Sequence, residues 1–122
     1  MDDDKNFFWF YVDGEEKIAT ENLVPGKQVY KEKLLLKKGT EYRLWDPFRS
    51  KLAASVMNGL TNFPFNEKSN ILYLGVSTGT TISHISDIIG PKGIVFGVEH
   101  SSRVARDFLD RVATYRKNIV PI

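Results

Sequence analysis

A buried strand that ends in a glycine turn constrains this chain more than any other feature. Residues 71–74, Ile-Leu-Tyr-Leu, have the unbroken apolar character of a strand covered on both faces, as in a parallel sheet. Gly75 and Gly79 permit a tight turn, and residues 82–89 then place isoleucines at helical spacing. Residues 93–98 resemble a second strand. This order of strand, turn, helix and strand predicts the first part of a nucleotide-binding βαβ unit.

Glu99 directly follows the second strand, 20 residues after Gly79. In open α/β sheets, ligands bind outside the carboxyl ends of the strands, where a carboxylate at this offset can accept hydrogen bonds from two ribose hydroxyls. The spacing Gly-x-x-x-Gly differs from the fingerprint Gly-x-Gly-x-x-Gly, which disfavours a dinucleotide. Two interpretations stay open, a smaller adenosyl ligand such as S-adenosylmethionine and a plain βαβ turn.

Composition limits which other kinds of site the chain can form, namely nucleic-acid, metal and membrane sites. A length of 122 residues suits one domain, and a net charge of +2 does not by itself indicate a nucleic-acid partner. The chain has no cysteine, which excludes thiolate metal sites, and its two histidines are too separated to predict a metal centre. His84 is expected on a helix flank. No apolar run approaches the roughly 20 residues that span a bilayer, so we expect no membrane partner.

The first 40 residues predict a small antiparallel β unit. Asp13 and Gly14 are a hairpin signal, and strand-forming aromatic residues precede them. We expect these aromatic side chains to form core or a partner-facing surface, because no basic residues interleave with them as in a base-stacking platform. The expected strands are residues 6–12, 15–20, 29–30 and 33–36.

Residues 41–51 are expected to connect this β unit to the second unit, with Asp46 as the N-cap and Pro47 as the first residue of a helix. Arg49 and Lys51 then fall in the first turns, where the helix dipole does not favour cations. Two cations against that preference suggest contact with an RNA phosphate or a reacting hydroxyl. The alternative is that both are simply solvated.

Five blocks of sequence occur in an order and spacing that point to one family. They are residues 22–26 (NLVPG), 41–54 (EYRLWDPFRSKLAA), 72–75 (LYLG), 79–84 (GTTISH) and 86–88 (SDI). With them, the chain resembles the fibrillarin family of box C/D ribonucleoprotein methyltransferases from about residue 8 to its last residue. The departures are small: Val76 and Thr78 stand where alanine is commoner, and His100 where phenylalanine is usual.

The resemblance implies an α/β protein with two domains. Residues 1–40 would be a small antiparallel β domain, and residues 41–122 the first part of a Rossmann-type methyltransferase domain. It further implies S-adenosylmethionine as cofactor and guide-RNA-directed ribose 2′-O-methylation of ribosomal RNA. The implied partners are box C/D guide RNA, ribosomal RNA and a Nop56/Nop58-type scaffold protein.

Carried onto this sequence, the resemblance assigns roles to individual residues. Glu99 would hold the ribose, with His100 next to the adenine. Lys51 matches the first lysine of the family's catalytic set, and with Arg49 it is a candidate for RNA binding. A cation suits the reaction because a 2′-hydroxyl is a poor nucleophile that needs a positioned base or a stabilised oxyanion. The residues assigned to the cofactor turn are Gly75, Ser77, Gly79, Thr80 and Thr81.

Family members continue with an acidic-Ala motif, a catalytic aspartate and a second lysine that have no counterpart here. We therefore expect a fragment that is inactive alone and needs a complementing chain or a homodimer to cover its sheet. The alternative function is a non-catalytic scaffold-binding or self-associating module, and a third is a nucleotide-binding protein unrelated to methyl transfer. Residues 46–49 and 89–93 favour a eukaryotic, nucleolar member over an archaeal, cytoplasmic one.

Overall fold

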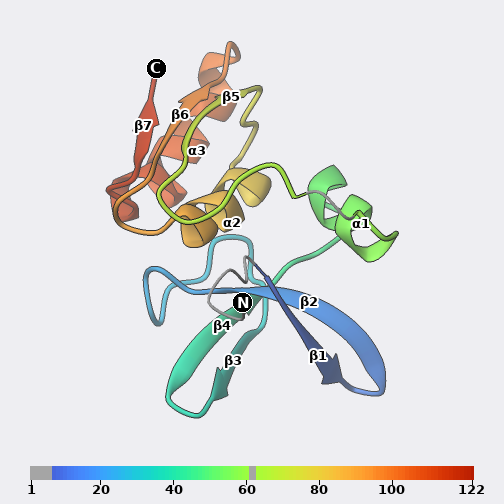
Figure 1. The fold of residues 1–122 in the computed structure, drawn as a ribbon. Helices are drawn as coiled ribbons and strands as arrows, with labels where there is room; N and C mark the ends of the chain where they lie inside the picture. Colours follow the sequence, from blue (N-terminus) through green and yellow to red (C-terminus); the bar gives the residue numbers. More distant parts are fainter. Residues whose placement is uncertain (1–6, 61–62) are drawn as a thin grey trace.

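The computed structural model describes residues 7–60 and 63–122. Its fold has two sheets, an antiparallel one followed by a parallel one, and helix α2 (Thr80–Ile89) lies between them (Figure 1). This arrangement confirms the expected α/β class with an antiparallel unit before a Rossmann-type unit. The predicted strand at residues 6–12 begins at Phe8, and its residue Asn6 lies outside the described ranges.

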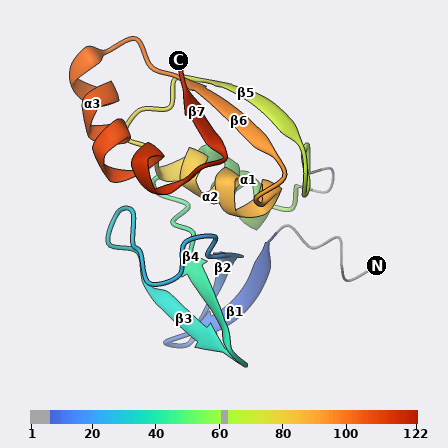
Figure 2. The ribbon, with the colours of Figure 1, turned by 90° about the vertical axis from the view of Figure 1, so that its left-hand side faces the viewer.

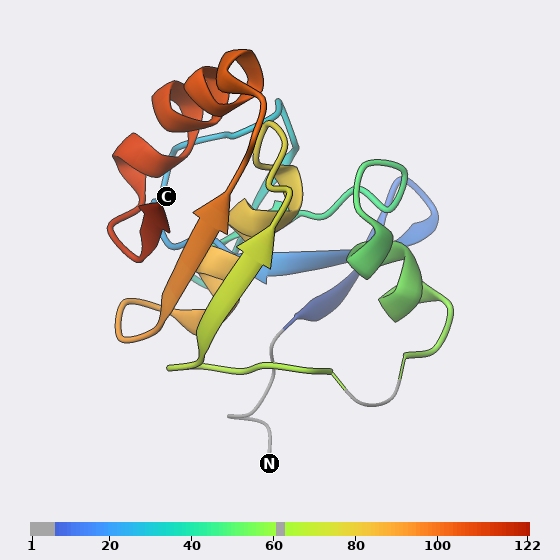
Figure 3. The same ribbon diagram turned by 90° about the horizontal axis from the view of Figure 1, so that it is seen from above.

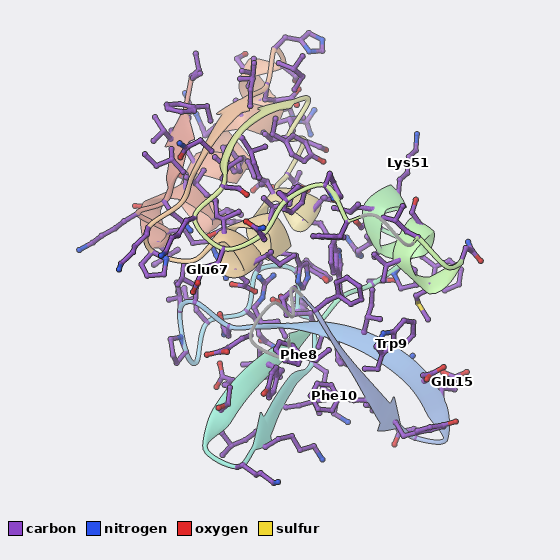
Figure 4. The ribbon with its side chains drawn as sticks, viewed as in Figure 1. Phe8, Trp9, Phe10, Glu15, Lys51 and Glu67 are labelled. Carbon is purple, nitrogen blue, oxygen red and sulfur yellow. The ribbon has the colours of Figure 1, made fainter. Side chains whose placement is uncertain are left out.

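The first sheet has the strand order β1-β2-β4-β3. The predicted hairpin joins its first two strands, and Asp13 and Gly14 have φ angles of 52° and 80°, as a type I′ turn requires. The rings of Phe8 and Phe10 in β1 pack on Tyr42 of β4, with centroids 5.0 and 4.9 Å apart (Figure 4). The strands are β1 (Phe8–Val12), β2 (Glu15–Glu21), β3 (Leu34–Lys37) and β4 (Thr40–Leu44).

Two expectations about this first unit are wrong. Residues 29–30 form no strand, because the Val29 and Tyr30 amides donate to the Glu32 carboxylate, at 2.9 and 2.8 Å, and so are not available to a neighbouring strand. The predicted connection at residues 41–51 begins too early, since Thr40–Leu44 is a strand that pairs with both β2 and β3. The division into domains at residue 40 stays a prediction.

The second sheet is parallel, with the order β5-β6-β7. Its first two strands lie side by side and point the same way (Figure 3). Helix α2 connects β5 to β6, and helix α3 (Ser102–Arg111) with the short 3₁₀ helix η2 (Ala113–Tyr115) connects β6 to β7, so the predicted βαβ unit is present. The strands are β5 (Asn70–Leu74), β6 (Ile94–Val98) and β7 (Ile119–Pro121).

The two faces of the second sheet differ. Helices α2 and α3 lie on one side of it (Figure 2), where the main apolar core forms. Leu72, Phe96 and Val120 form a row across the opposite face, because they are register partners in neighbouring strands. We call this opposite face, which carries exposed apolar side chains, the bare face; it is defined by Leu72, Leu74, Ile94, Phe96 and Val120.

Helix α1 (Lys51–Met57) begins later than the sequence suggests. Its N-cap is Ser50, whose hydroxyl accepts from the Ala53 amide, so the prediction of Asp46 as the cap is wrong. The Asp46 carboxylate accepts from the Phe48 amide at 2.9 Å, which stabilises a turn over the residues expected to start the helix. Lys51 is therefore the first helical residue, and Arg49 precedes the helix.

Candidate functional site

A cavity of about 510 Å³ opens between the start of α1 and the carboxyl end of β5. Arg49 and Lys51 line it from the α1 side, and the glycine turn lines it from the other. The turn residues in the wall include Gly75, Ser77, Thr80 and Thr81. The structure thus brings both predicted cations and most of the predicted cofactor turn to one cavity.

The conformation of the turn explains its glycines. Gly75 has a φ of 79°, and its amide and that of Val76 both donate to the Val98 carbonyl, at 2.8 and 3.1 Å. Gly79 has a φ of 105°, and a Cβ there would lie 2.7 Å from a Val112 methyl carbon. Gly79 is therefore needed for close packing of the turn on α3, and it is not among the residues that line the cavity.

Glu99 lies against the same turn. Its carboxylate accepts from the amides of Ser77 and Ser101, at 2.8 and 3.2 Å, and its side chain is 10% exposed. These two amide hydrogen bonds are the main reason that the pKa of Glu99 is lowered, so the group is ionised at neutral pH. Each carboxylate oxygen keeps a lone pair for a further donor, so a pair of ligand hydroxyls fits here.

His100 lies apart from the rest of the predicted set. Its side chain is 96% exposed, and its Nδ1 lies 3.7 Å from a Glu99 oxygen. Neither His100 nor Glu99 lines the cavity. The predicted residues therefore form two groups, the cavity wall and the Glu99 side of the turn, which meet at Ser77.

The two cations differ in their surroundings. Lys51 extends from α1 into solvent, away from the first sheet (Figure 4). The Arg49 guanidinium lies 5.8 Å from the centre of the Tyr30 ring and 3.8 Å from the Asp46 carboxylate. Both residues line the cavity and are exposed, so their cations could meet a phosphate without losing a buried partner.

Sequence reasoning missed a buried polar cluster between the first sheet and α2, which we call the polar junction. At its centre, the Asp87 carboxylate accepts from Arg43 at 2.9 Å, from Arg116 at 2.6 Å and from the Thr20 hydroxyl at 2.6 Å. Each of these charged side chains is at most 2% exposed. The polar junction comprises Thr20, Glu32, Arg43, Ser83, His84, Asp87 and Arg116.

His84 belongs to this junction. It was expected on a helix flank, and the structure shows that its side chain is fully buried. Burial, reinforced by Arg43 and Arg116, holds the pKa of His84 well below its ordinary value, so the ring is neutral. The Thr20 hydroxyl donates to Asp87, so Nδ1 of His84 carries the proton and donates to Thr20 at 2.8 Å. Its Nε2 accepts from the Tyr30 hydroxyl at 2.6 Å. The only sequence signal was a histidine on the polar side of an isoleucine-rich helix.

Two classes of site are absent from the part of the chain that the structure describes. Within residues 7–60 and 63–122, no group of three or more histidine, cysteine, aspartate and glutamate side chains could hold a metal ion. No helix in these ranges is both long and apolar enough to cross a membrane.

Comparison with known proteins supports a single family. Residues 2–122 match the family model described as fibrillarin. A fibrillarin-like rRNA/tRNA 2′-O-methyltransferase from Pyrococcus abyssi is 56% identical over 110 residues, which cover 90% of this chain and 48% of the relative. The protein of the same name from Pyrobaculum aerophilum is 52% identical over 113 residues, or 92% and 48%.

Solved structures agree with this match. The structure of Aeropyrum pernix fibrillarin with natively bound S-adenosyl-L-methionine superposes with a TM-score of 0.93 at 49% identity, covering 97% of this chain and 51% of that one. A fibrillarin/Nop5p complex superposes with a TM-score of 0.74 at 33% identity, covering 93% and 49%. The chain therefore spans about half the length of the relatives that it matches, as expected for part of a family member.

Proposed function

This chain belongs to the fibrillarin family, and from that premise we propose that it supplies the cofactor turn and one catalytic lysine of a ribose 2′-O-methyltransferase. The enzyme would use S-adenosylmethionine and be directed to ribosomal RNA by a box C/D guide RNA. One observation carries the proposal: Arg49 and Lys51 share a cavity with the glycine turn, against which Glu99 is held. The chain alone, at about half the length of its relatives, would be inactive.

The chemistry of the turn suits an adenosyl ligand. In the proposal, Glu99 accepts from the ribose hydroxyls, and His100 lies beside the adenine. S-adenosylmethionine, when bound, supplies an electrophilic methyl group on a sulfonium. The other residues proposed for the cofactor are Gly75, Ser77, Gly79, Thr80 and Thr81.

The two cations would act on the RNA side of the cavity. Arg49 and Lys51 would contact RNA phosphates, which position the target ribose. The Lys51 ammonium would then stabilise the negative charge that develops on the 2′-oxygen as its proton passes to a general base, which would come from the part of the enzyme that this chain does not cover. Substitution of Lys51 by alanine in the completed enzyme should therefore lower kcat more than it raises KM for the cofactor.

Calorimetry with S-adenosylmethionine tests the cofactor role. Glu99→Gln removes the charge and should weaken binding about 10-fold or more, since hydrogen bonds to charged groups contribute about 1.5–3 kcal/mol. Glu67→Gln is the matched control, because Glu67 is exposed and lies outside the cavity. Absence of both heat and a thermal shift with the unaltered chain would contradict the proposal. Tighter binding of NAD or ATP would favour the unrelated nucleotide-binding function.

We further propose that the bare face is covered by a second polypeptide. The five side chains that define it are uncharged, yet Leu72 is 62% and Leu74 72% exposed. Parallel sheets are normally covered on both faces, so such an exposed apolar face is unusual. The face is three strands wide, with strands about 4.8 Å apart, and its two longer strands have five residues while β7 has three, so it measures at most roughly 14 by 17 Å. That footprint has the width of one or two helices. A complementing chain is favoured over a homodimer, because the relatives contain further sequence that this chain does not cover.

Complementation can be tested with the second half of the Pyrococcus abyssi relative as a separate chain. We expect a one-to-one complex that methylates guide-targeted RNA, and Leu72→Asp should weaken its formation by at least about 10-fold. Lys37→Asp is a control for the added charge, because Lys37 lies in β3 of the other sheet. Self-association of the chain, seen as a dimer in sedimentation, with no complex would instead favour the self-associating module.

Other partners follow from the family. A Nop56/Nop58-type scaffold protein is proposed, and the fibrillarin/Nop5p complex supports it. Both sequence relatives named above are archaeal, which supports the cytoplasmic rather than the nucleolar alternative. Binding of purified scaffold protein to the chain, measured by calorimetry, would test the non-catalytic scaffold-binding role independently of the cofactor.

A further inference from the structure

One hydroxyl pair joins the cofactor turn to the helix that carries Lys51. The Thr81 hydroxyl donates to the Ser50 hydroxyl at 2.8 Å, and the two residues are 31 positions apart in the sequence. Thr81 is the second residue of α2, directly after the turn, and Ser50 directly precedes Lys51. The contact therefore links the side of the cavity formed by the turn to the side that carries Arg49 and Lys51.

Ser50 is more than an ordinary helix cap. Capping requires one acceptor for an amide, and the Ser50 hydroxyl provides it to Ala53 at 3.3 Å. The same oxygen also accepts from Thr81, although a capping serine needs no such second partner. Ser50 is only 3% exposed, so water does not readily replace Thr81 as that partner.

The other end of the cation-bearing loop is held to the same helix. The Asp46 amide donates to the Tyr30 hydroxyl at 3.2 Å, and that hydroxyl contacts Nε2 of His84 in α2 at 2.6 Å. Residues 46–50 are thus attached to α2 at His84 and at Thr81. The first attachment is made to the buried ring of His84, and the Thr81–Ser50 contact is the one that adjoins Lys51.

We propose that Ser50 is a positioning residue, which couples the cofactor turn to α1 through Thr81 and so fixes the start of α1, at Lys51, relative to that turn. This inference rests on the proposed function and deepens it. When an adenosyl ligand orders the turn, the Thr81–Ser50 contact becomes stronger and local unfolding of α1 becomes less frequent. By thermodynamic reciprocity, loss of the contact weakens ligand binding.

A double-mutant cycle separates this coupling from direct contact of Thr81 with the ligand. Thr81→Val removes only the donating hydroxyl, Thr81→Ser retains it, and Ser50→Gly removes the acceptor while costing a cap little. S-adenosylmethionine affinity, measured by calorimetry, should fall about fivefold for Thr81→Val and stay within about twofold of the original for Thr81→Ser. In the Ser50→Gly background, Thr81→Val should change the affinity by less than about twofold, because the contact is already lost.

Hydrogen exchange provides a readout that a purely structural role would not move. Addition of S-adenosylmethionine should slow exchange of the α1 amides in the original chain and in Thr81→Ser, but not in Thr81→Val. Two results would overturn this inference but leave the proposed function intact. One is an equal effect of Thr81→Val on affinity in both Ser50 backgrounds, and the other is equal slowing of α1 amide exchange in all variants. If the original chain does not bind S-adenosylmethionine, the inference fails together with the proposed function.

Discussion

The polar junction and the bare face both depart from the usual arrangement, in which charged side chains are exposed and apolar side chains are buried. At the junction, the side chains of Arg43 and Asp87 are 0% exposed, although both carry charges. On the bare face, Leu74 is 72% exposed, although its side chain is entirely apolar. Buried charges and exposed leucines are both costly in isolation, and the two regions differ in whether the chain itself removes that cost.

The junction is complete within the chain. The Arg43 guanidinium donates to Glu32, Asp87 and Ser83, and Arg116 donates to Asp87 as well. Among the described residues, Nε1 of Trp45 is the only buried side-chain polar atom without a hydrogen-bond partner, and it is not one of the junction's charges. The bare face has no such internal partners. A partner polypeptide is therefore to be sought where apolar groups lack cover, and not where charges gather.

Removal of Asp87 should have the largest effect on the free energy of unfolding, because it disrupts the polar junction, whose charges are paired within the chain. Asp87→Ala leaves Arg43 and Arg116 buried without their shared anion, and loss of one partner from a buried charge pair costs about 3–5 kcal/mol. Urea unfolding followed by circular dichroism should show a much lower midpoint. Asp107→Ala is the control, because its pair with Arg111 is partly exposed and is worth at most about 0.5 kcal/mol. Equal losses in the two variants would show that the junction is not a tightly coupled network.

The second unit could be predicted closely from its sequence, because its signals are local. The apolar run before Gly75, the isoleucine spacing of α2 and the offset of Glu99 each involve neighbours in the chain, and the structure has the elements where they were expected. The cavity could be predicted only in part. Nothing local indicates that Lys51 and the turn line the same cavity, because α1 is placed by tertiary contacts.

The junction could not be predicted, because its members are distant in sequence. Thr20 and Asp87, for example, are 67 positions apart. A lone serine, histidine or aspartate on a helix is usually solvated, so the polar side of α2 suggested exposure. The start of α1 was misplaced for a related reason: Asp46 and Pro47 form a good capping pattern, but a turn and the Ser50–Thr81 contact move the start to Lys51.

The two faces of the second sheet offer a sharper comparison, with an intermediate effect, between Gly97 in β6 and Leu74 in β5. Gly97 faces the helices, where an added Cβ would lie 2.9 Å from side-chain carbons of Ile82 and Val76. Gly97→Ala should therefore destabilise the fold by about 1–3 kcal/mol through overpacking. Leu74→Ala on the bare face should cost less than about 1 kcal/mol, because most of the leucine is already in water. A cost for Leu74→Ala equal to that for Gly97→Ala in urea unfolding would show that the bare face is covered in solution.

The smallest predicted effect is the pH dependence that His84 gives to the free energy of unfolding. The pKa of His84 is lowered in the folded chain by burial, Arg43 and Arg116, so below about pH 6.5 the unfolded chain binds a proton that the folded one does not. The free energy of unfolding should be independent of this group above pH 6.5 and fall by at most about 1.4 kcal/mol per pH unit below it.

Urea unfolding between pH 7.5 and 5.5 measures this slope in a range above the one where the lowered pKa of Glu99 contributes. His84→Gln should flatten the slope, because glutamine cannot take up the proton. A slope that persists in His84→Gln would mean that another group of the junction titrates, and that its charges are less completely paired than the structure indicates.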